Sequence, residues 1–149
     1  HRKETQMQHR RPHILTILVG GALLILATDA SAGDPKAYRC LFETGGVAVY
    51  DKGAFRTEKA SSLGLEISGI EIDAQTAVLD GPGVAKPIRV VRAVNALHFL
   101  EVAAEGFLNV TTVYDRDDAK GAHPAVHSRH FGVLGQPLVS QYTGFCQEK

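Results

Sequence analysis

Alternating apolar and polar residues mark the centre of the chain, where two runs, Ala96–Val102 and Phe107–Tyr114, meet at a glycine. This pattern is typical of a β-hairpin. A three-residue loop, Ala104–Gly106, places the glycine where such loops favour a left-handed backbone. The resulting register pairs these residues on one face: Val102 with Leu108, Leu100 with Val110 and His98 with Thr112. It leaves Glu101 with Asn109 and Phe99 with Thr111 on the other, so we expect the leucine and valine face to cover the core.

The rest of the chain contains further short segments with strand patterns, separated by turn residues. The predicted strands are Tyr38–Phe42 and Val47–Tyr50 around a turn at Thr44–Gly46, then Leu65–Asp73, Thr76–Leu79, Ile88–Val94, Ala125–Phe131 and Leu138–Cys146. A bulge at Ser68–Gly69 would restore one apolar face in the third of these. Residues 54–63 fit either a strand or a single helical turn. Together these segments predict an all-β fold, a small antiparallel barrel or sandwich of about eight strands.

The first 32 residues have the features of a signal peptide. If Met7 is the true start, Arg10 and Arg11 precede an apolar run of 14 residues, and Ala30-Ser31-Ala32 forms a cleavage site. As a helix this run spans about 21 Å, short of the roughly 30 Å hydrocarbon core of a bilayer. We expect no membrane span in the mature protein, a single β domain over residues 33–149, and a periplasmic location in a Gram-negative cell.

Composition narrows the possible partners. Four of the 16 basic and two of the 16 acidic residues lie in the first 32 positions, which leaves 12 and 14 and a formal charge of −2. Basic residues are scattered along the remaining chain rather than gathered into a patch. Nucleic-acid binding is therefore not expected.

Two cysteines, Cys40 and Cys146, stand near the two ends of the predicted domain. In an oxidising compartment they should form a disulfide bond. Two distant thiols without a C-x-x-C pair make a poor metal site. Because bonded cysteines hold their Cα atoms within about 7 Å, the first and last strands must be neighbours or face each other across the core.

Three histidines and an arginine lie within His123–His130, the segment with the most reactive side chains. On a strand, His127 and His130 should point to opposite faces. His123 and His127 are four residues apart, so they would be separated by about 13 Å. A zinc site would therefore need a further ligand from elsewhere, such as Asp115 or Asp117. We take His127, Arg129 and His130 as candidate ligand-binding residues, and we expect no metal and no cofactor.

The sequence gives weaker signals for a calcium site, a nucleophilic serine and an acid–base pair. The loop after Tyr114 departs from a calcium-binding loop, because Lys120 stands where that loop requires glycine. Ser128 lies beside two histidines but lacks the G-x-S-x-G elbow of a nucleophilic serine. Glu71 and Glu101 could act as acid and base only if the fold brought them together. No catalytic residue is assigned, and an enzyme is not expected.

The segments Ala125–His130 and Gln136–Cys146 resemble a group of small exported proteins of Gram-negative bacteria that carry no assigned function. The resemblance runs from Tyr38 onward and implies a shared β-fold and a periplasmic address. Tyr38-Arg-Cys40 followed by Val47–Asp51 is more distantly similar to the periplasmic C-type lysozyme inhibitors, small β-barrels with a clasping disulfide. The Ser-Gly-x-x-Tyr-like loop of those inhibitors has no counterpart here, so the likeness implies a fold and not an activity.

Two functions remain open from the sequence. The first is a non-enzymatic envelope protein that binds another protein or a cell-wall component through its loops. The alternative is a carrier of a small ligand or metal, which would use the barrel interior or the His123–His130 segment.

Overall fold

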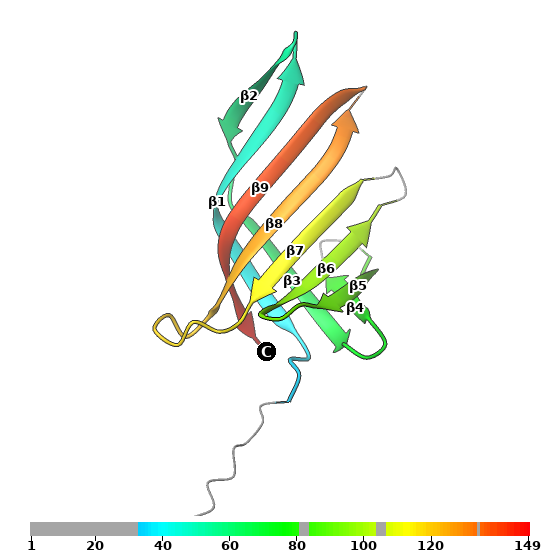
Figure 1. Ribbon diagram of the computed structural model, residues 1–149, viewed down its shortest axis with the longest axis vertical. Coiled ribbons are helices and arrows are strands. Elements are labelled where there is room, and N and C mark those ends of the chain that lie inside the picture. Colours follow the sequence, from blue (N-terminus) through cyan, green and yellow to red (C-terminus); the bar gives the residue numbers. More distant parts are fainter. Residues whose placement is uncertain (1–32, 81–83, 104–106, 134) are drawn as a thin grey trace, which may run out of the picture. The chain divides into compact units, whose positions relative to one another are not determined.

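The computed structural model describes residues 33–80, 84–103, 107–133 and 135–149. The predicted signal peptide lies outside these residues. The described part forms nine strands (Figure 1), and none of it is a helix long and apolar enough to cross a membrane. In chain order, the strands are β1 (Tyr38–Asp51), β2 (Ala54–Lys59), β3 (Leu63–Glu71), β4 (Thr76–Asp80), β5 (Lys86–Arg92), β6 (Ala96–Val102), β7 (Leu108–Tyr114), β8 (His123–Val133) and β9 (Gln136–Glu148).

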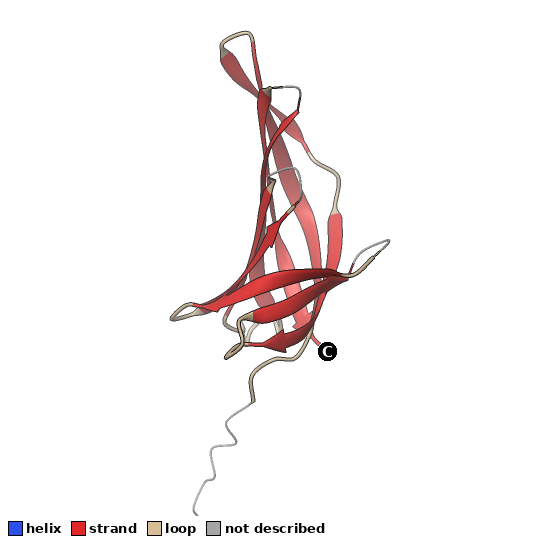
Figure 2. Ribbon diagram, turned by 90° about the vertical axis from the view of Figure 1, so that its right-hand side faces the viewer, coloured by secondary structure: helices blue, strands red, loops and turns tan. Residues whose placement is uncertain are grey.

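From β3 to β9, each strand pairs antiparallel with the next one along the chain. The sheet closes because β1 pairs with β9, from Tyr38 opposite Glu148 to Val49 opposite Leu138. The other edge of β1 pairs with β3 over its first half and with β2 over its second half. The result is a closed eight-stranded antiparallel barrel with β2 as one extra strand, visible from two sides in Figures 1 and 2. The predicted all-β fold is confirmed, and of the two predicted alternatives, barrel and sandwich, the structure has the barrel.

The disulfide bond closes the barrel at its seam. Cys40 on β1 lies directly opposite Cys146 on β9, and the two sulfur atoms are bonded. Both residues are almost fully buried. The predicted disulfide is therefore confirmed, and it joins the first strand to the last.

One predicted turn is wrong. Thr44–Gly46 does not separate two strands but lies inside β1, which contains a register irregularity between Leu41 and Thr44. The reason lies on the neighbouring strand: a Cβ atom at Gly45 would stand only 2.4 Å from Cδ1 of Tyr142. The glycine leaves room for this aromatic ring against the continuous strand.

Apolar side chains fill the part of the barrel near the disulfide. The largest fully buried ones include Phe42, Phe99, Ile67, Ile70, Val90 and Val113. The predicted bulge at Ser68–Gly69 is confirmed, because the register shifts after Ser68 and Gly69 has a positive φ of 57°. This extra residue allows Ile67 and Ile70 to face the interior together.

The central hairpin has the predicted register but the opposite orientation. Val102 pairs with Leu108, Leu100 with Val110 and His98 with Thr112. The face that points inward, however, contains Phe99 and Thr111, which are 2% and 5% exposed, whereas Val102 on the other face is 77% exposed. The expectation that the leucine and valine face covers the core is therefore wrong, and Glu101 and Asn109 lie inside the barrel.

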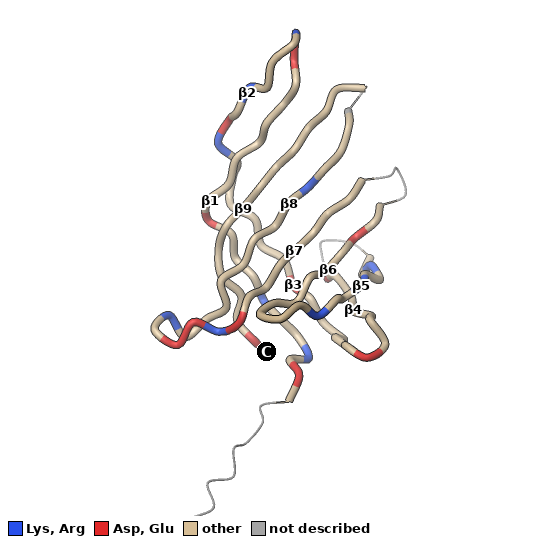
Figure 3. The backbone as a smooth tube through the Cα atoms, in the orientation of Figure 1, with Lys and Arg blue, Asp and Glu red and all other residues tan. Residues whose placement is uncertain are grey.

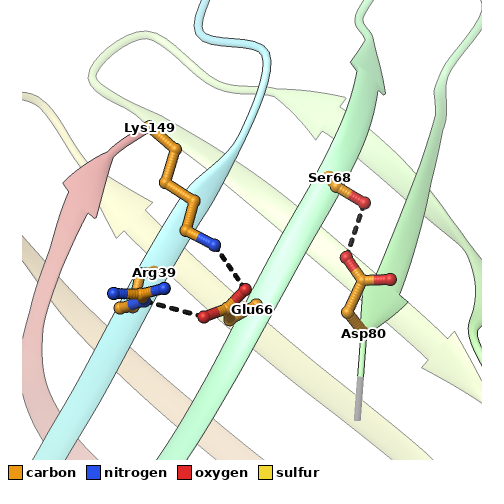
Figure 4. A network of polar contacts seen from close by, with 5 residues as sticks. All are labelled: Arg39, Glu66, Ser68, Asp80 and Lys149. Atoms are coloured by element: carbon orange, nitrogen blue, oxygen red, sulfur yellow. Dashed lines mark hydrogen bonds and ion pairs between the residues drawn. The ribbon is translucent and has the colours of Figure 1, made fainter.

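Charged residues of both signs are interspersed along the described strands and loops (Figure 3). On the outer wall, Glu66 of β3 accepts hydrogen bonds from Arg39 of β1 and from the C-terminal Lys149 (Figure 4). These contacts connect β3 to β1 and to Lys149, which follows β9, but exposed ion pairs add little to stability.

Candidate ligand-binding cavity

A cavity of about 630 Å³ is lined by residues of β3 to β8 and of the connections before β5 and β7, and the exposed Val84 lies at its rim. Because the strands form a meander, the start of β3, β5 and β7 and the end of β4, β6 and β8 meet at one end of the barrel. The apolar part of the cavity wall consists of Leu63, Leu65, Leu79, Val84, Phe107 and Phe131. The polar part consists of Lys86, Glu101, Asn109, His127 and Arg129, with Asp80 at the outer side.

Strand alternation explains why polar groups converge there. Along β6 the inward positions read Leu97, Phe99 and then Glu101. The first two are buried in the core, and the third lines the cavity. Strand β8, which is separated from β6 by β7, repeats the order, with Ala125 in the core followed by His127 and Arg129 at the cavity. The interior therefore changes from apolar to polar along the barrel.

Glu101 is held by two partners at the cavity, of which Lys86 has a 62% exposed side chain. The ammonium group of Lys86 donates to its Oε1 atom over 3.0 Å, and the Asn109 amide donates to its Oε2 atom over 2.7 Å. Burial alone would raise the pKa of Glu101, but these hydrogen bonds and the charge of Lys86 lower it below the ordinary value. The carboxylate is therefore ionised at neutral pH, and both of its oxygen atoms are engaged.

His127 is neutral and fixed in one tautomer. Its Nε2 atom accepts a hydrogen bond from Nε of Arg129 over 3.1 Å, so the ring proton is on Nδ1. Nδ1 lies 2.8 Å from Thr111 Oγ1 and donates to it. Burial, followed by the positive charge of Arg129, lowers the pKa of His127 from 6.5 to about 4.

Arg129 is the positive charge of the cavity that has no carboxylate beside it. Among the described residues, no Asp or Glu oxygen lies within ion-pair distance of its guanidinium group. The group stands 5.9 Å from the centre of the Tyr142 ring, a cation–π contact. Directly across the β8–β9 ladder is Ser140, whose buried Oγ atom has no hydrogen-bond partner in the described part of the chain.

The candidate residues from the sequence divide between two surfaces. His127 and Arg129 line the cavity, whereas His130 is exposed on the outer wall, as strand alternation predicted. His123 is buried at the other end of β8, where its ring nitrogens contact the Tyr114 carbonyl and Glu148. The structure therefore brings only two of the three candidate ligand-binding residues into one site.

Other sequence candidates lie apart from the cavity. Asp117 accepts hydrogen bonds from the backbone of Ala119 and Lys120 in its own loop. Glu71 pairs with Lys36 on the surface and does not meet Glu101. Across the described residues, no three His, Cys, Asp or Glu side chains gather closely enough to hold a metal ion.

Sequence reasoning missed Lys86, Asn109 and the inward position of Glu101. The sequence did hold one signal, because Glu101 and Asn109 are direct cross-strand partners in the predicted register. A carboxylate opposite an amide was interpreted as the solvent face of the hairpin. In the structure this pair and Lys86 form the polar wall of the cavity.

The fold and the cavity define a class of protein, a closed antiparallel β-barrel whose interior is packed near the disulfide and hollow elsewhere. Comparison of the chain with models of protein families, with curated proteins and with solved structures finds no match. The resemblance to small exported proteins and to lysozyme inhibitors therefore stays a prediction.

Proposed function

We propose that this protein binds and carries a small amphipathic molecule inside its barrel. The observation that supports the proposal is the cavity, whose volume of about 630 Å³ falls in the range of ligand pockets. An eight-stranded barrel is just wide enough either to be filled by side chains or to hold one small ligand. Its mixed apolar and polar walls suit a molecule with an apolar body and a polar group.

A carrier was the alternative function from the sequence, and the cavity favours it over binding through loops. Residues 81–83, 104–106 and 134, which belong to three of the connections, are outside the described part of the chain. Binding of a protein or cell-wall partner by these loops stays a prediction. A disulfide bond persists in oxidising compartments, which supports the proposed periplasmic location.

The proposal can be tested with the neutral fluorescent probe N-phenyl-1-naphthylamine, whose emission rises in apolar surroundings. The wild-type protein should bind the probe with saturation at about one site. Leu65→Trp, which adds bulk to the cavity wall, should weaken binding about tenfold or more, because overfilled space cannot admit the ring system.

Leu108→Trp is the matched control, because Leu108 lies on the outer face of β7 and is 39% exposed. This variant should bind like the wild type. Thermal melting of both variants checks that they are folded, and Leu79→Trp provides a second change in the cavity. Absence of saturable binding to the wild type, or unchanged binding to both cavity variants, contradicts the proposal.

A further inference from the structure

The charges inside the cavity point to the chemistry of the ligand. Lys86 and Glu101 form an ion pair, and Asn109 occupies the remaining carboxylate oxygen. The Glu101 side chain is only 12% exposed. These three residues therefore satisfy one another, and the Glu101 carboxylate has no oxygen left unpaired for a cationic ligand.

Asp80 does not offer a free carboxylate for a cationic ligand either. It follows Leu79, an inward-facing residue that packs against the core, so strand alternation turns Asp80 toward the outer wall. There its Oδ2 atom accepts a hydrogen bond from Ser68 over 2.6 Å (Figure 4). Among the described residues that line the cavity, the two acidic groups, Glu101 and Asp80, are thus both engaged.

Unlike Lys86, Arg129 has no carboxylate partner among the described residues. His127 holds the guanidinium through Nε, and the Tyr142 ring supports it from the side. His127 supplies no charge to offset it, because the ring is neutral. The end of the guanidinium that carries the two terminal nitrogens is the edge that binds a carboxylate through two parallel hydrogen bonds.

Ser140 is the cross-strand neighbour of Arg129 on the inward face of β9, and it is 3% exposed. It is not one of the residues that line the cavity. Arg129 is therefore the member of this cross-strand pair that a ligand in the cavity can contact.

We infer that the cavity takes a monocarboxylate with an apolar tail, whose carboxylate pairs with Arg129 and whose tail lies against Leu63, Leu65 and Phe131. This inference rests on the proposed function and adds the class of ligand to it. The apolar wall would contact the tail of the ligand, and the guanidinium group would bind its carboxylate. A neutral molecule with the same tail should bind more weakly, and a cationic one weaker still.

Calorimetric titration with three probes of equal chain length, decanoate, 1-decanol and decylammonium, tests the inference. Decanoate should bind the wild type about tenfold more tightly than decanol, as expected for a hydrogen-bonded ion pair. Arg129→Gln should remove this preference and leave decanol affinity within about twofold. Arg129→Lys, which keeps the charge but loses the planar fork, should fall between them.

Arg89→Gln is the matched control, because Arg89 is an exposed arginine of β5 that donates to Gln75. It should keep the preference for decanoate. Equal affinity for decanoate and decanol, a preference for decylammonium, or an unchanged preference in Arg129→Gln overturns the carboxylate assignment while leaving the proposed carrier function intact. Failure of all three probes, together with failure of the neutral naphthylamine probe, overturns both.

Discussion

His127 couples the stability of the fold to pH. In the folded protein the pKa of His127 is about 4, whereas its ordinary value is 6.5. Between these values the unfolded chain takes up a proton that the folded chain does not, so stability rises with pH through this window. We expect the free energy of unfolding to be about 2 kcal/mol lower at pH 5 than at pH 7 through this residue alone. Urea unfolding at the two pH values measures the difference.

The contribution of His127 can be separated from that of other groups with His127→Gln. Glutamine can still accept from Arg129 and donate to Thr111, but it does not titrate, so the pH dependence should become weaker by about 2 kcal/mol. Ser128→Ala, on the next and outward-facing residue, should keep the wild-type pH dependence. An unchanged pH dependence in His127→Gln contradicts the assignment. Glu101 does not obscure the effect, because its lowered pKa moves its stability loss to pH values below 4.5.

At this scale, the residue types alone did not decide which side chains face the interior. The alternation of β8 correctly placed His127 and His130 on opposite faces. Which of the two faces was the inner one could not be derived, because both contain polar residues. The orientation of a single side chain in a polar cavity depends on partners such as Thr111 and Arg129, which come together only in the folded barrel.

At the scale of elements, β1 and β9 approach each other closely at Gly144. A Cβ atom at Gly144 would lie 2.1 Å from the Leu41 carbonyl oxygen and 2.6 Å from the Phe42 Cα atom. Both obstacles are backbone atoms that cannot rotate away. Gly144→Ala should therefore lower the free energy of unfolding by about 3 kcal/mol, as measured by urea denaturation.

Gly46→Ala serves as the control for that change. Its added methyl group would stand 3.6 Å from the nearest heavy atom, the Glu58 carbonyl oxygen, which is ordinary contact. The expected change in unfolding free energy is within about 0.5 kcal/mol. Similar effects of the two substitutions would show that the close approach at Gly144 does not limit the seam.

The hairpin of β6 and β7 shows both the strength and the limit of pattern reading. Its register was predictable because alternation and loop length allow only one pairing of the two strands. Its orientation was not, because apolar residues such as Leu100 and Val110 were assumed to face inward. In the barrel the other face of the hairpin points inward, so Glu101 and Asn109 line the polar part of the cavity.

At the scale of the whole molecule, one covalent bond closes the barrel. Cys40 and Cys146 are separated by 106 residues, so the bond restricts almost the whole unfolded domain. Reduction should lower the free energy of unfolding by about 4 to 5 kcal/mol if the effect is mainly chain entropy. Urea unfolding with and without dithiothreitol, followed by circular dichroism, measures this change.

A double variant, Cys40→Ala with Cys146→Ala, provides the control for reduction. It should unfold at lower urea than the oxidised wild type and should not respond to dithiothreitol. A wild type whose midpoint is the same in both redox conditions would contradict a stabilising role for the bond. The reduced protein should still contain the nine strands, because their ladders do not depend on the sulfur atoms.

The closed barrel followed from the sequence because two distant cysteines constrain the ends of a chain of short strands. The extra strand β2 was one of two alternatives, because residues 54–63 fitted either a strand or a helical turn. The continuous strand β1 did not follow, because Gly45 and Gly46 are turn residues by type and were interpreted as the end of a strand. The cavity was also beyond the sequence, since it forms where six strand ends meet.

The order of the strands has a consequence for how the chain assembles during synthesis. β1 can pair early with β2 and β3 on one edge, but the strand for its other edge is β9, the last of the nine strands along the chain. Until then a strand of 14 residues exposes unused backbone donors and acceptors that can recruit another chain. The folding chain is therefore most vulnerable to aggregation until β9 pairs with β1.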